Sequence, residues 1–472
     1  MKRSILPVLV IISEGLLNGC ISVGPDYETP ETEVPDTWHA VVMEDFQSGQ
    51  PDLQTWWSIF DDEMLNDLIQ RVSTNNLDLQ TAAARIEQAA ALRGVSASQY
   101  FPSIFADASA SAVQSPEWQV PAGSDRDGEL YNAGLSMTWE LDLWGRIRRS
   151  VESADASLQA TVENYRDIMV MLYAETATTY IDVRTTQARI AIAEGNLTAQ
   201  EETMELTRNR FNSGLAPALD VSQAELNRSR TESYIPPLRQ RLTEAINRLG
   251  VLTGEMPYAL QQELSIPAEI PSTSQTITAG LPSELLRQRP DIRRAERELA
   301  AQHALIGATK ATLYPTLSLP GALVLESPSG SDLFESGNTA YSFGPQLRWN
   351  IFSGGRIRNS IRAEEAGTKA ALLSYEQTVL RALEEVENSM AAYANEKDRI
   401  TSLESSATAA QKSVQLVTQL YTSGLTDFQN VLNMEQALLA QQDALATSRG
   451  LVSAYLVSVY RALGGGWDAN GM

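Results

Sequence analysis

Residues 210–225 read Arg210-Phe-Asn-Ser-Gly-Leu-Ala-Pro-Ala-Leu-Asp-Val-Ser-Gln-Ala-Glu225, and residues 420–435 repeat this stretch as Leu420-Tyr-Thr-Ser-Gly-Leu-Thr-Asp-Phe-Gln-Asn-Val-Leu-Asn-Met-Glu435. At the same offset, residues 139–148 correspond to residues 349–358, and both segments contain Gly-Arg-Ile-Arg. The repeat unit is about 210 residues long, since the two stretches lie 210 positions apart. It therefore exceeds the roughly 20 to 50 residues of solenoid repeats. The chain is therefore a tandem duplication, and we expect one large architecture built from two similar halves.

The N-terminus has the layout of a lipoprotein signal. Lys2 and Arg3 precede an apolar run, and Cys20, the only cysteine of the chain, follows it. We expect a signal peptide over residues 1–19 and a covalent lipid on Cys20, with no other cofactor. An unmodified cysteine at the end of an ordinary signal peptide is the alternative. A triacylated Cys20 would anchor the chain stably, because two or more acyl chains hold a protein at a membrane.

Composition narrows the classes of function. The chain has 36 Lys and Arg against 59 Asp and Glu, and its net charge of −23 argues against nucleic acid as a partner. Mean hydropathy is −0.21. After the signal, no run approaches the roughly 20 apolar residues that a membrane helix requires. If the protein crosses a bilayer, we expect it to do so with strands.

Amphipathic strands are predicted at matching places in the two halves. Apolar residues alternate with small or polar ones in residues 131–141 and 341–351, and each run has about the 9 to 11 residues of a transmembrane strand. Residues 104–113 and 317–325 are their expected hairpin partners. One such strand alone would suit a half-buried strand of a soluble sheet. Two matched hairpins favour a membrane, since aromatic residues lie near the strand ends: Trp139, Trp144 and Trp349.

The rest of the chain is predicted to be helical. Residues 148–213 and 358–423 contain no proline, and each stretch is long enough for a helix of about 100 Å at 1.5 Å per residue. Gly214 and Gly424 are expected to close these helices in the left-handed conformation. The spacing of Leu158, Val162, Tyr165, Met169 and Leu172 is typical of a coiled-coil seam. Shorter helices are expected before each hairpin and after each glycine: 63–99, 283–313, 219–249 and 428–463.

These elements divide the chain into six segments. They are a signal peptide (1–19), an acylated N-terminal extension (20–62), repeat 1 (63–256), an inter-repeat linker (257–282), repeat 2 (283–464) and a C-terminal tail (465–472). Four strands cannot close a barrel, and open edges are not tolerated in lipid. Two copies would give eight strands around a filled interior, and three are the smallest open conduit. The predicted fold class is an α+β membrane protein in which several copies together supply the strands of a β-barrel, twelve strands in a trimer.

At this point the residues match a known family. The chain resembles the TolC-like outer membrane factors, within them the NodT-type lipoprotein branch. The resemblance rests on Val23-Gly-Pro-Asp-Tyr27, Trp56-Trp57, Arg289-Pro-Asp-Ile292, the paired Gly-Arg-Ile-Arg turns and the ending Tyr460-Arg-Ala-Leu-Gly-Gly-Gly-Trp467. It implies a lipid-anchored homotrimer in the outer membrane of a Gram-negative bacterium, a trimeric twelve-strand β-barrel continuous with a long α-helical barrel that extends into the periplasm. It also implies a passive exit duct for drugs or metabolites, opened by a periplasmic adaptor and an inner-membrane pump.

The resemblance also implies where such a duct closes. In the family the periplasmic tip holds an aperture of acidic and apolar residues. By position we assign this role to Asp427, with Leu425 and Val431 as apolar companions, and to Asp220. The alternative is that both carboxylates merely cap the return helices. Carboxylates crowded on a trimer axis would make the closed tip cation-selective.

Four arginines open the long helices, where the helix dipole disfavours cations. They are Arg146, Arg148, Arg356 and Arg358. Contact with lipid head groups at the inner leaflet boundary would explain them, and so would salt bridges to a neighbouring helix. The sequence leaves both open.

Two other classes of protein compete with a channel. For an enzyme, His39 and His303 are the only histidines, and no catalytic set, metal-ligand cluster or phosphate loop is apparent. A structural periplasmic coiled-coil lipoprotein without a pore would share the anchor and the long helices. It would have no use for two amphipathic hairpins with aromatic ends, and so we favour the channel.

Overall fold

The computed structural model describes residues 22–39, 46–47, 53–273, 277–278 and 282–467. The predicted signal peptide and Cys20 lie outside the described residues. None of the described helices combines the length and the apolar character that a bilayer span requires.

Two long helices dominate the chain, as the sequence predicts. Helices α4 (Arg146–Asn212) and α9 (Arg356–Thr422) have 67 residues each, and they begin two residues before the expected position. The return helices follow as α5 (Ala218–Leu252) and α10 (Phe428–Ala462). Helix α5 contains Pro236 and Pro237 and still continues through them. The two halves of the sequence therefore fold alike in their helical parts.

The helices before the hairpins are divided, where single helices were expected. In repeat 1 they are α2 (Glu63–Asn75) and α3 (Leu77–Ser98). The side chain of Asn76 between them accepts the N–H groups of Asp78 at 2.8 Å and Leu79 at 3.1 Å. In repeat 2, Arg289 separates α7 (Pro282–Gln288) from α8 (Pro290–Ala311). An N-capping side chain and a proline at the first helical position both start a new helix.

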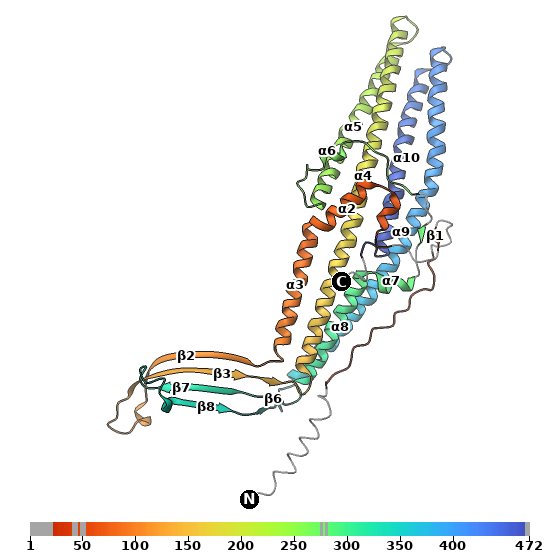
Figure 1. The fold of residues 1–472 in the computed structure, drawn as a ribbon. Coiled ribbons are helices and arrows are strands. Elements are labelled where there is room, and N and C mark those ends of the chain that lie inside the picture. The colour runs from red at the N-terminus through yellow and green to blue at the C-terminus, as the bar shows by residue number, and fades with distance from the viewer. Residues whose placement is uncertain (1–21, 40–45, 48–52, 274–276, 279–281, 468–472) are drawn as a thin grey trace. The chain divides into compact units, whose positions relative to one another are not determined.

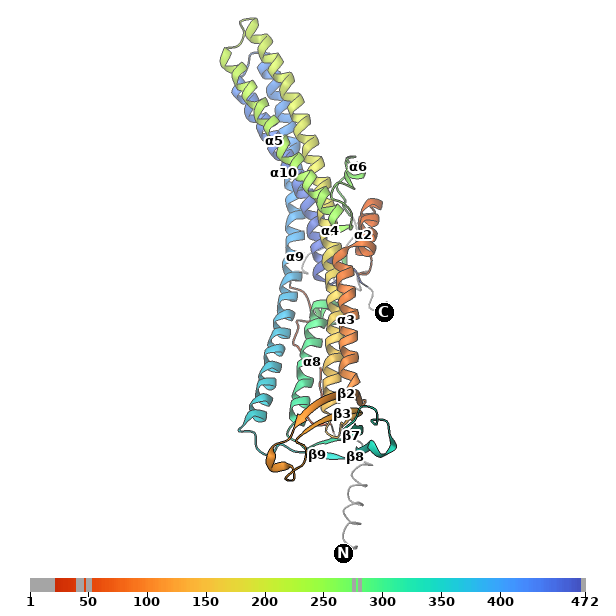
Figure 2. The same ribbon diagram turned by 90° about the vertical axis from the view of Figure 1, so that its left-hand side faces the viewer.

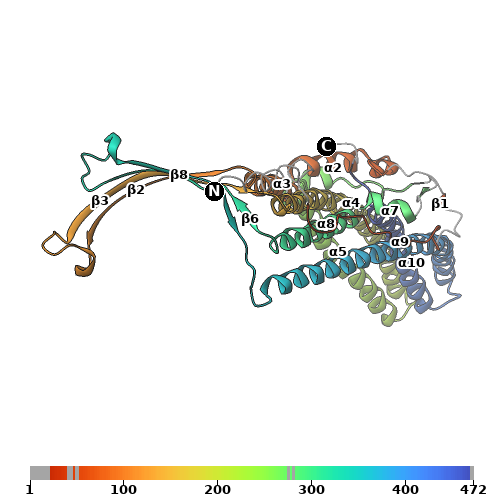
Figure 3. The ribbon, with the colours of Figure 1, turned by 90° about the horizontal axis from the view of Figure 1, so that it is seen from below.

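A four-stranded antiparallel sheet joins the two repeats. Its order is β2 (Ser103–Gln114), β3 (Asp127–Thr138), β7 (Gly321–Ser327) and β8 (Thr339–Phe343). Figure 1 shows the strands side by side, and Figure 3 shows that the sheet is curved. The expected hairpins are confirmed, because Ala108 pairs with Ala133 and Leu323 with Tyr341. The central pairing, Gly134 with Val324, connects strands far apart in the sequence.

Prolines shorten the strands of repeat 2. The expected run 317–325 is interrupted at Leu319 and Pro320, and the run 341–351 is interrupted at Gly344 and Pro345. Proline has no N–H group to donate to a strand ladder. The pieces cut off by these interruptions are β6 (Thr316–Ser318) and β9 (Gln346–Arg348). They form a second sheet with β4 (Glu140–Leu141) of repeat 1. A parallel pair of two-residue strands, β1 (Phe46–Gln47) and β5 (Ile277–Thr278), lies elsewhere.

Two compact units result, and each takes segments from both repeats. The first includes residues 85–161 and 294–375 with the chain up to Glu31, and the second includes residues 32–84, 162–293 and the chain from Glu376. The first contains the two antiparallel sheets, and the second contains the β1–β5 pair. In the second, α5 lies beside α10, which Figure 2 shows. The repeats are therefore a property of the sequence, whereas packing pairs an element of one repeat with its counterpart in the other.

The buried face of α4 differs from the seam that the sequence predicts. Of the predicted seam only Leu172 is buried, and the other four side chains are half-buried. Small residues such as Ala156, Ala160 and Ala177 are buried instead. Alanine lets a neighbouring helix approach closely, so apolar size alone does not identify the packed face.

Candidate functional site

Two glycine turns close the helical hairpins of the second unit. Gly214 has φ +73° and Gly424 has φ +74°, in the left-handed region that a residue with a Cβ rarely adopts. Just after each glycine, the Leu215 N–H donates to the Arg210 carbonyl at 2.8 Å and the Leu425 N–H to the Leu420 carbonyl at 2.9 Å. The predicted helix-closing role of both glycines is confirmed.

An apolar cluster packs the two hairpins together beneath these turns. It consists of Ala224, Tyr421, Phe428, Val431 and Leu432, with Met204 and Val417 against it. The Tyr421 and Phe428 rings meet edge to face at 5.3 Å. Val431 is 0% exposed in this cluster, so its predicted place in an aperture is wrong. Its side chain is buried in the core of the protomer, so no part of it is exposed to line a channel.

Polar contacts connect the hairpins above that cluster. The Tyr421 hydroxyl donates to Asp220 Oδ2 at 3.1 Å, and the Arg210 Nη1 donates to the Thr422 carbonyl at 2.6 Å. The Arg210 guanidinium also lies 4.9 Å from the centre of the Tyr421 ring. Burial raises the pKa of the Tyr421 hydroxyl, so it stays a hydrogen-bond donor at neutral pH. Asp220 therefore holds a contact between the α4–α5 hairpin and the α9–α10 hairpin.

Helix capping does not account for the two aspartates. Asp220 is the third residue of α5, and the N-cap position belongs to Pro217. Asp427 occupies the N-cap position of α10, but its carboxylate makes no capping hydrogen bond. Asp427 is exposed, and Leu425 is 75% exposed. The side chains of Asp427 and Leu425 are therefore available at the surface of the protomer beside the turn.

A buried carboxyl lies next to this cluster, and the sequence analysis missed it. Glu435 is 5% exposed; its Oε1 accepts from the Thr203 hydroxyl at 2.7 Å and its Oε2 from the Asn227 amide at 2.9 Å. Burial raises its pKa. The counterpart in repeat 1, Glu225, is exposed and pairs with Arg208 at 2.9 Å. The repeat alone therefore gave no signal of a buried acid.

The predicted interface tryptophans have fixed indole groups in the first unit. The Trp139 Nε1 donates to the Tyr100 carbonyl at 2.9 Å, and the Trp349 Nε1 donates to the Leu313 carbonyl at 3.0 Å. These two bonds correspond in the two repeats. Trp144 donates to the Pro315 carbonyl at 2.8 Å and stacks on another ring. Each indole N–H is therefore hydrogen-bonded within the protein, and only the apolar carbon atoms of the ring are left for other surroundings.

The four arginines at the helix starts fall into two classes. In repeat 1, Arg146 pairs with Glu140 at 2.8 Å. Asp142 lies 3.4 Å from Arg148, and it also accepts the N–H groups at the start of α4. These carboxylates belong to the segment just before the helix, not to a neighbouring helix. Among the described residues, no ion pair is found for Arg356 or Arg358, and both are exposed.

The N-terminal motif packs against the first unit. The Val23 N–H donates to the Trp144 carbonyl at 3.0 Å, and Tyr27 donates to Glu296 at 2.6 Å. Asp26 pairs with Arg149 at 2.7 Å. Gly24 has φ +102°, and a Cβ there would lie 2.5 Å from the backbone of Gly307. The segment that follows Cys20 is therefore held by specific contacts.

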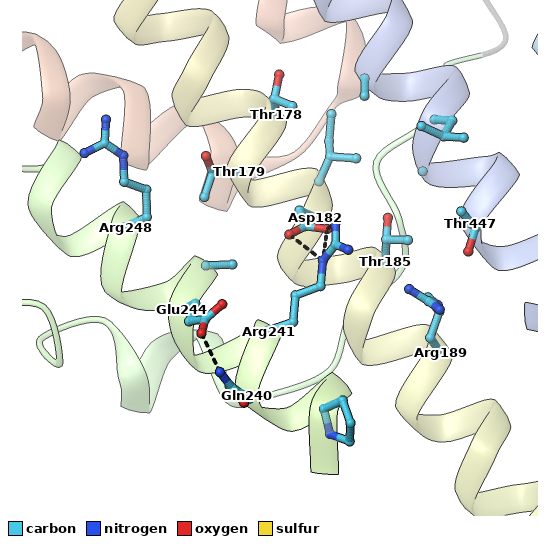
Figure 4. Close-up of a pocket in the computed structure, with 16 residues that line it drawn as sticks. Thr178, Thr179, Asp182, Thr185, Arg189, Gln240, Arg241, Glu244, Arg248 and Thr447 are labelled. Atoms are coloured by element: carbon cyan, nitrogen blue, oxygen red, sulfur yellow. Dashed lines mark hydrogen bonds and ion pairs between the residues drawn. The ribbon is translucent and has the colours of Figure 1, made fainter. Parts of the chain in front are cut away.

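A cavity of about 820 Å³ opens between α4, α5 and α10, and its charged side chains have partners. Figure 4 shows Arg241 directed at Asp182, and the two form an ion pair at 2.8 Å. Arg248 pairs with Glu175 at 2.5 Å, and Arg189 pairs with Asp443 at 2.7 Å. Its arginines are neutralised within the protein, which gives no reason to place a charged ligand there. No cluster suited to a metal ion occurs within the described ranges.

Comparisons with known proteins agree with this geometry. Residues 68–255 and 281–465 match the family model described as outer membrane efflux protein. The solvent efflux pump outer membrane protein SrpC of Pseudomonas putida is 30% identical over 481 residues, 100% of both chains. Nodulation protein T of Rhizobium leguminosarum bv. trifolii is 30% identical over 437 residues, 91% of each chain.

Solved structures share the fold. The outer-membrane channel OprN is 37% identical, has a TM-score of 0.88, and the match covers 94% of this chain and 99% of that chain. The open state of the MtrE outer membrane channel of Neisseria gonorrhoeae is 26% identical with a TM-score of 0.80, over 94% of this chain and 98% of that chain. The predicted fold class is confirmed. This protein belongs to the outer membrane efflux protein family and is an efflux channel of the outer membrane.

Proposed function

We propose that this channel is the exit duct of a tripartite drug or metabolite efflux system, a passive conduit that works as a homotrimer. Its partners would be a periplasmic adaptor and an inner-membrane pump, and a lipid on Cys20 would anchor it. The names of relatives support this, since SrpC and OprJ of Pseudomonas aeruginosa are outer membrane proteins and SrpC belongs to a solvent efflux pump. The outer edges of β2 and β8, which pair with no other described strand of the chain, support assembly, because strands in lipid must close into a barrel.

The periplasmic aperture is the tip formed by the two helical hairpins. The observation that carries this assignment is the contact of Asp220 with Tyr421, together with that of Arg210 with the Thr422 carbonyl. These contacts hold one hairpin against the other, so opening would break them while each hairpin keeps its own turn. Asp427, exposed beside Leu425, is the carboxylate that would face the axis.

Single-channel conductance in a planar bilayer tests the aperture. We expect a small, cation-selective conductance for the full-length protein, because carboxylates on the axis attract cations. Tyr421→Phe should raise the conductance by weakening the link between hairpins, and Asp427→Ala should reduce cation selectivity. Glu205→Ala, which removes an exposed carboxylate of α4 nine residues before Gly214, is the control. Equal conductance and selectivity in all four proteins would contradict the assignment of the aperture.

The structural lipoprotein alternative is tested by the same measurement. A spacer without a pore has no role for a four-stranded sheet with aromatic residues at its strand ends. Intact trimers that produce no conductance in wild type or in any variant would return us to that alternative.

A further inference from the structure

One segment of this acidic chain is cationic and free of acids. Residues 339–363 contain Arg348, Arg356, Arg358 and Arg362 and no Asp or Glu, whereas the whole chain has a net charge of −23. The segment covers β8, β9 and the start of α9 in the first unit. Arg348 lies on β9, so the charge is not confined to the helix end.

The arginines at the start of the long helix have carboxylate partners in repeat 1 but not, among the described residues, in repeat 2. In repeat 1, Glu140 and Asp142 pair with Arg146 and Arg148, and Asp142 also accepts the N–H groups of Ile147 at 3.0 Å and Arg148 at 2.9 Å. Repeat 1 thus shows the chemistry that this turn takes, an anion shared by an arginine and the first helical N–H groups.

In repeat 2 the corresponding residues are neutral. Asn350 and Phe352 stand 210 positions after Glu140 and Asp142. Within the described parts of the chain, no carboxylate pairs with any of the four arginines. The one hydrogen bond found for their side chains among the described residues is a long one, from Arg362 to Asn359 at 3.4 Å. The second repeat therefore keeps the cations and lacks the anion.

Exposed apolar side chains accompany these cations. Trp349 is 59% exposed, Ile351 is 82% exposed and Phe352 is 86% exposed. Among the described residues, none buries Ile351 or Phe352, and Trp349 keeps only its indole N–H bonded, to the Leu313 carbonyl. A soluble anion such as inorganic phosphate would satisfy the arginines and leave these side chains in water. A phospholipid would satisfy both, because its phosphate binds guanidinium groups and its acyl chains accept apolar side chains.

We propose that Arg356, Arg358 and Arg362, with Trp349, Ile351 and Phe352, bind anionic phospholipid of the outer membrane, while repeat 1 does so much less. Arginine suits phosphate since its planar fork donates two hydrogen bonds at once. The proposal rests on the outer-membrane location of the channel. It does not depend on how the periplasmic tip opens.

Native mass spectrometry of the detergent-purified full-length trimer, titrated with phosphatidylglycerol, tests the proposal. Each basic residue at an anionic lipid surface contributes about a fivefold gain in affinity, so the double variant Arg356→Gln, Arg358→Gln should bind phosphatidylglycerol roughly thirtyfold more weakly. The matched control is Arg146→Gln, Arg148→Gln, which removes the same charge from the neutralised turn. We expect it to bind phosphatidylglycerol like the wild type.

Three results would overturn the proposal. The first is an equal affinity for phosphatidylglycerol in the wild type and both variants. The second is competition by inorganic phosphate as strong as by the lipid, which would indicate a soluble anion. The third is dissociation of the Arg356→Gln, Arg358→Gln trimer in the absence of added lipid, which would indicate a contact with a second copy of the chain. If the first result is obtained while the wild type still conducts, the lipid site is refuted and the channel function stands.

Discussion

The buried carboxyl of Glu435 predicts that the tip loosens as pH rises. Thr203 Oγ1 lies 2.7 Å from Glu435 Oε1 and 3.0 Å from the Ala199 carbonyl, and a hydroxyl has one proton for these two acceptors. If Glu435 is ionised, either its carboxylate or the Ala199 carbonyl receives no hydrogen bond from Thr203. If Glu435 is protonated, it can donate to Thr203, and Thr203 can donate to the carbonyl. Neither hydrogen-bond partner of Glu435, Thr203 or Asn227, is a cation that would favour the charged form.

The sign and size of the effect follow from linkage. Burial raises the folded pKa of Glu435, so its contribution to stability is complete below the unfolded pKa of about 4.3 and is lost as pH rises through the folded pKa. Between the two pKa values the free energy of opening falls by at most about 1.4 kcal/mol per pH unit, a factor of ten. Glu435→Gln keeps the shape, and its amide can accept from Asn227 and donate to Thr203 as the protonated acid does. Because the amide does not titrate, this substitution should remove the dependence on pH.

Amide hydrogen exchange of the peptides around Gly214 and Gly424 measures the opening. The ratio of protection between Glu435→Gln and wild type cancels the intrinsic pH dependence of exchange. We expect the ratio to rise by up to tenfold per pH unit above about pH 4.3 and then to level off. Glu225→Gln, at the equivalent exposed position, should show no such rise. A ratio for Glu435→Gln that stays constant across this range would falsify the reasoning.

Three further substitutions test the packing of the second unit, each by the thermal unfolding of the purified channel. Gly450→Ala should cost about 1–3 kcal/mol, because its Cβ would collide with the Thr185 side chain, and Thr185→Ala should recover most of the loss. Asn76→Ala should cost about 1–2 kcal/mol by removing the cap of α3, whereas a serine there should retain much of it. Arg289→Gln should cost about 3–5 kcal/mol, because it leaves Asp291 without its buried partner and leaves Glu385 with Arg461 alone.

Local chemistry explains what could be predicted correctly. The helix ends at Gly214 and Gly424 follow from the ability of glycine to adopt positive φ, and the hairpins follow from alternating polarity. Both signals lie within a few residues. The predictions that were wrong depend on a neighbour distant in the chain. The predicted seam of α4 and the exposure of Val431 needed knowledge of which helix packs on which face.

The sequence by itself determined the duplication, the two long helices, the paired hairpins and the family. The duplication follows from comparing the two halves, and the helices and hairpins follow from periodicity and turn residues within each half. None of these features requires knowledge of how the halves pack. Only the tertiary structure decided that Tyr421 meets Asp220 and that Glu435 is buried while Glu225 is exposed. Two copies of one unit occupy different surroundings once they pack together. Burial and ion pairing are properties of those surroundings, and matching positions in the repeat therefore acquire different chemistry.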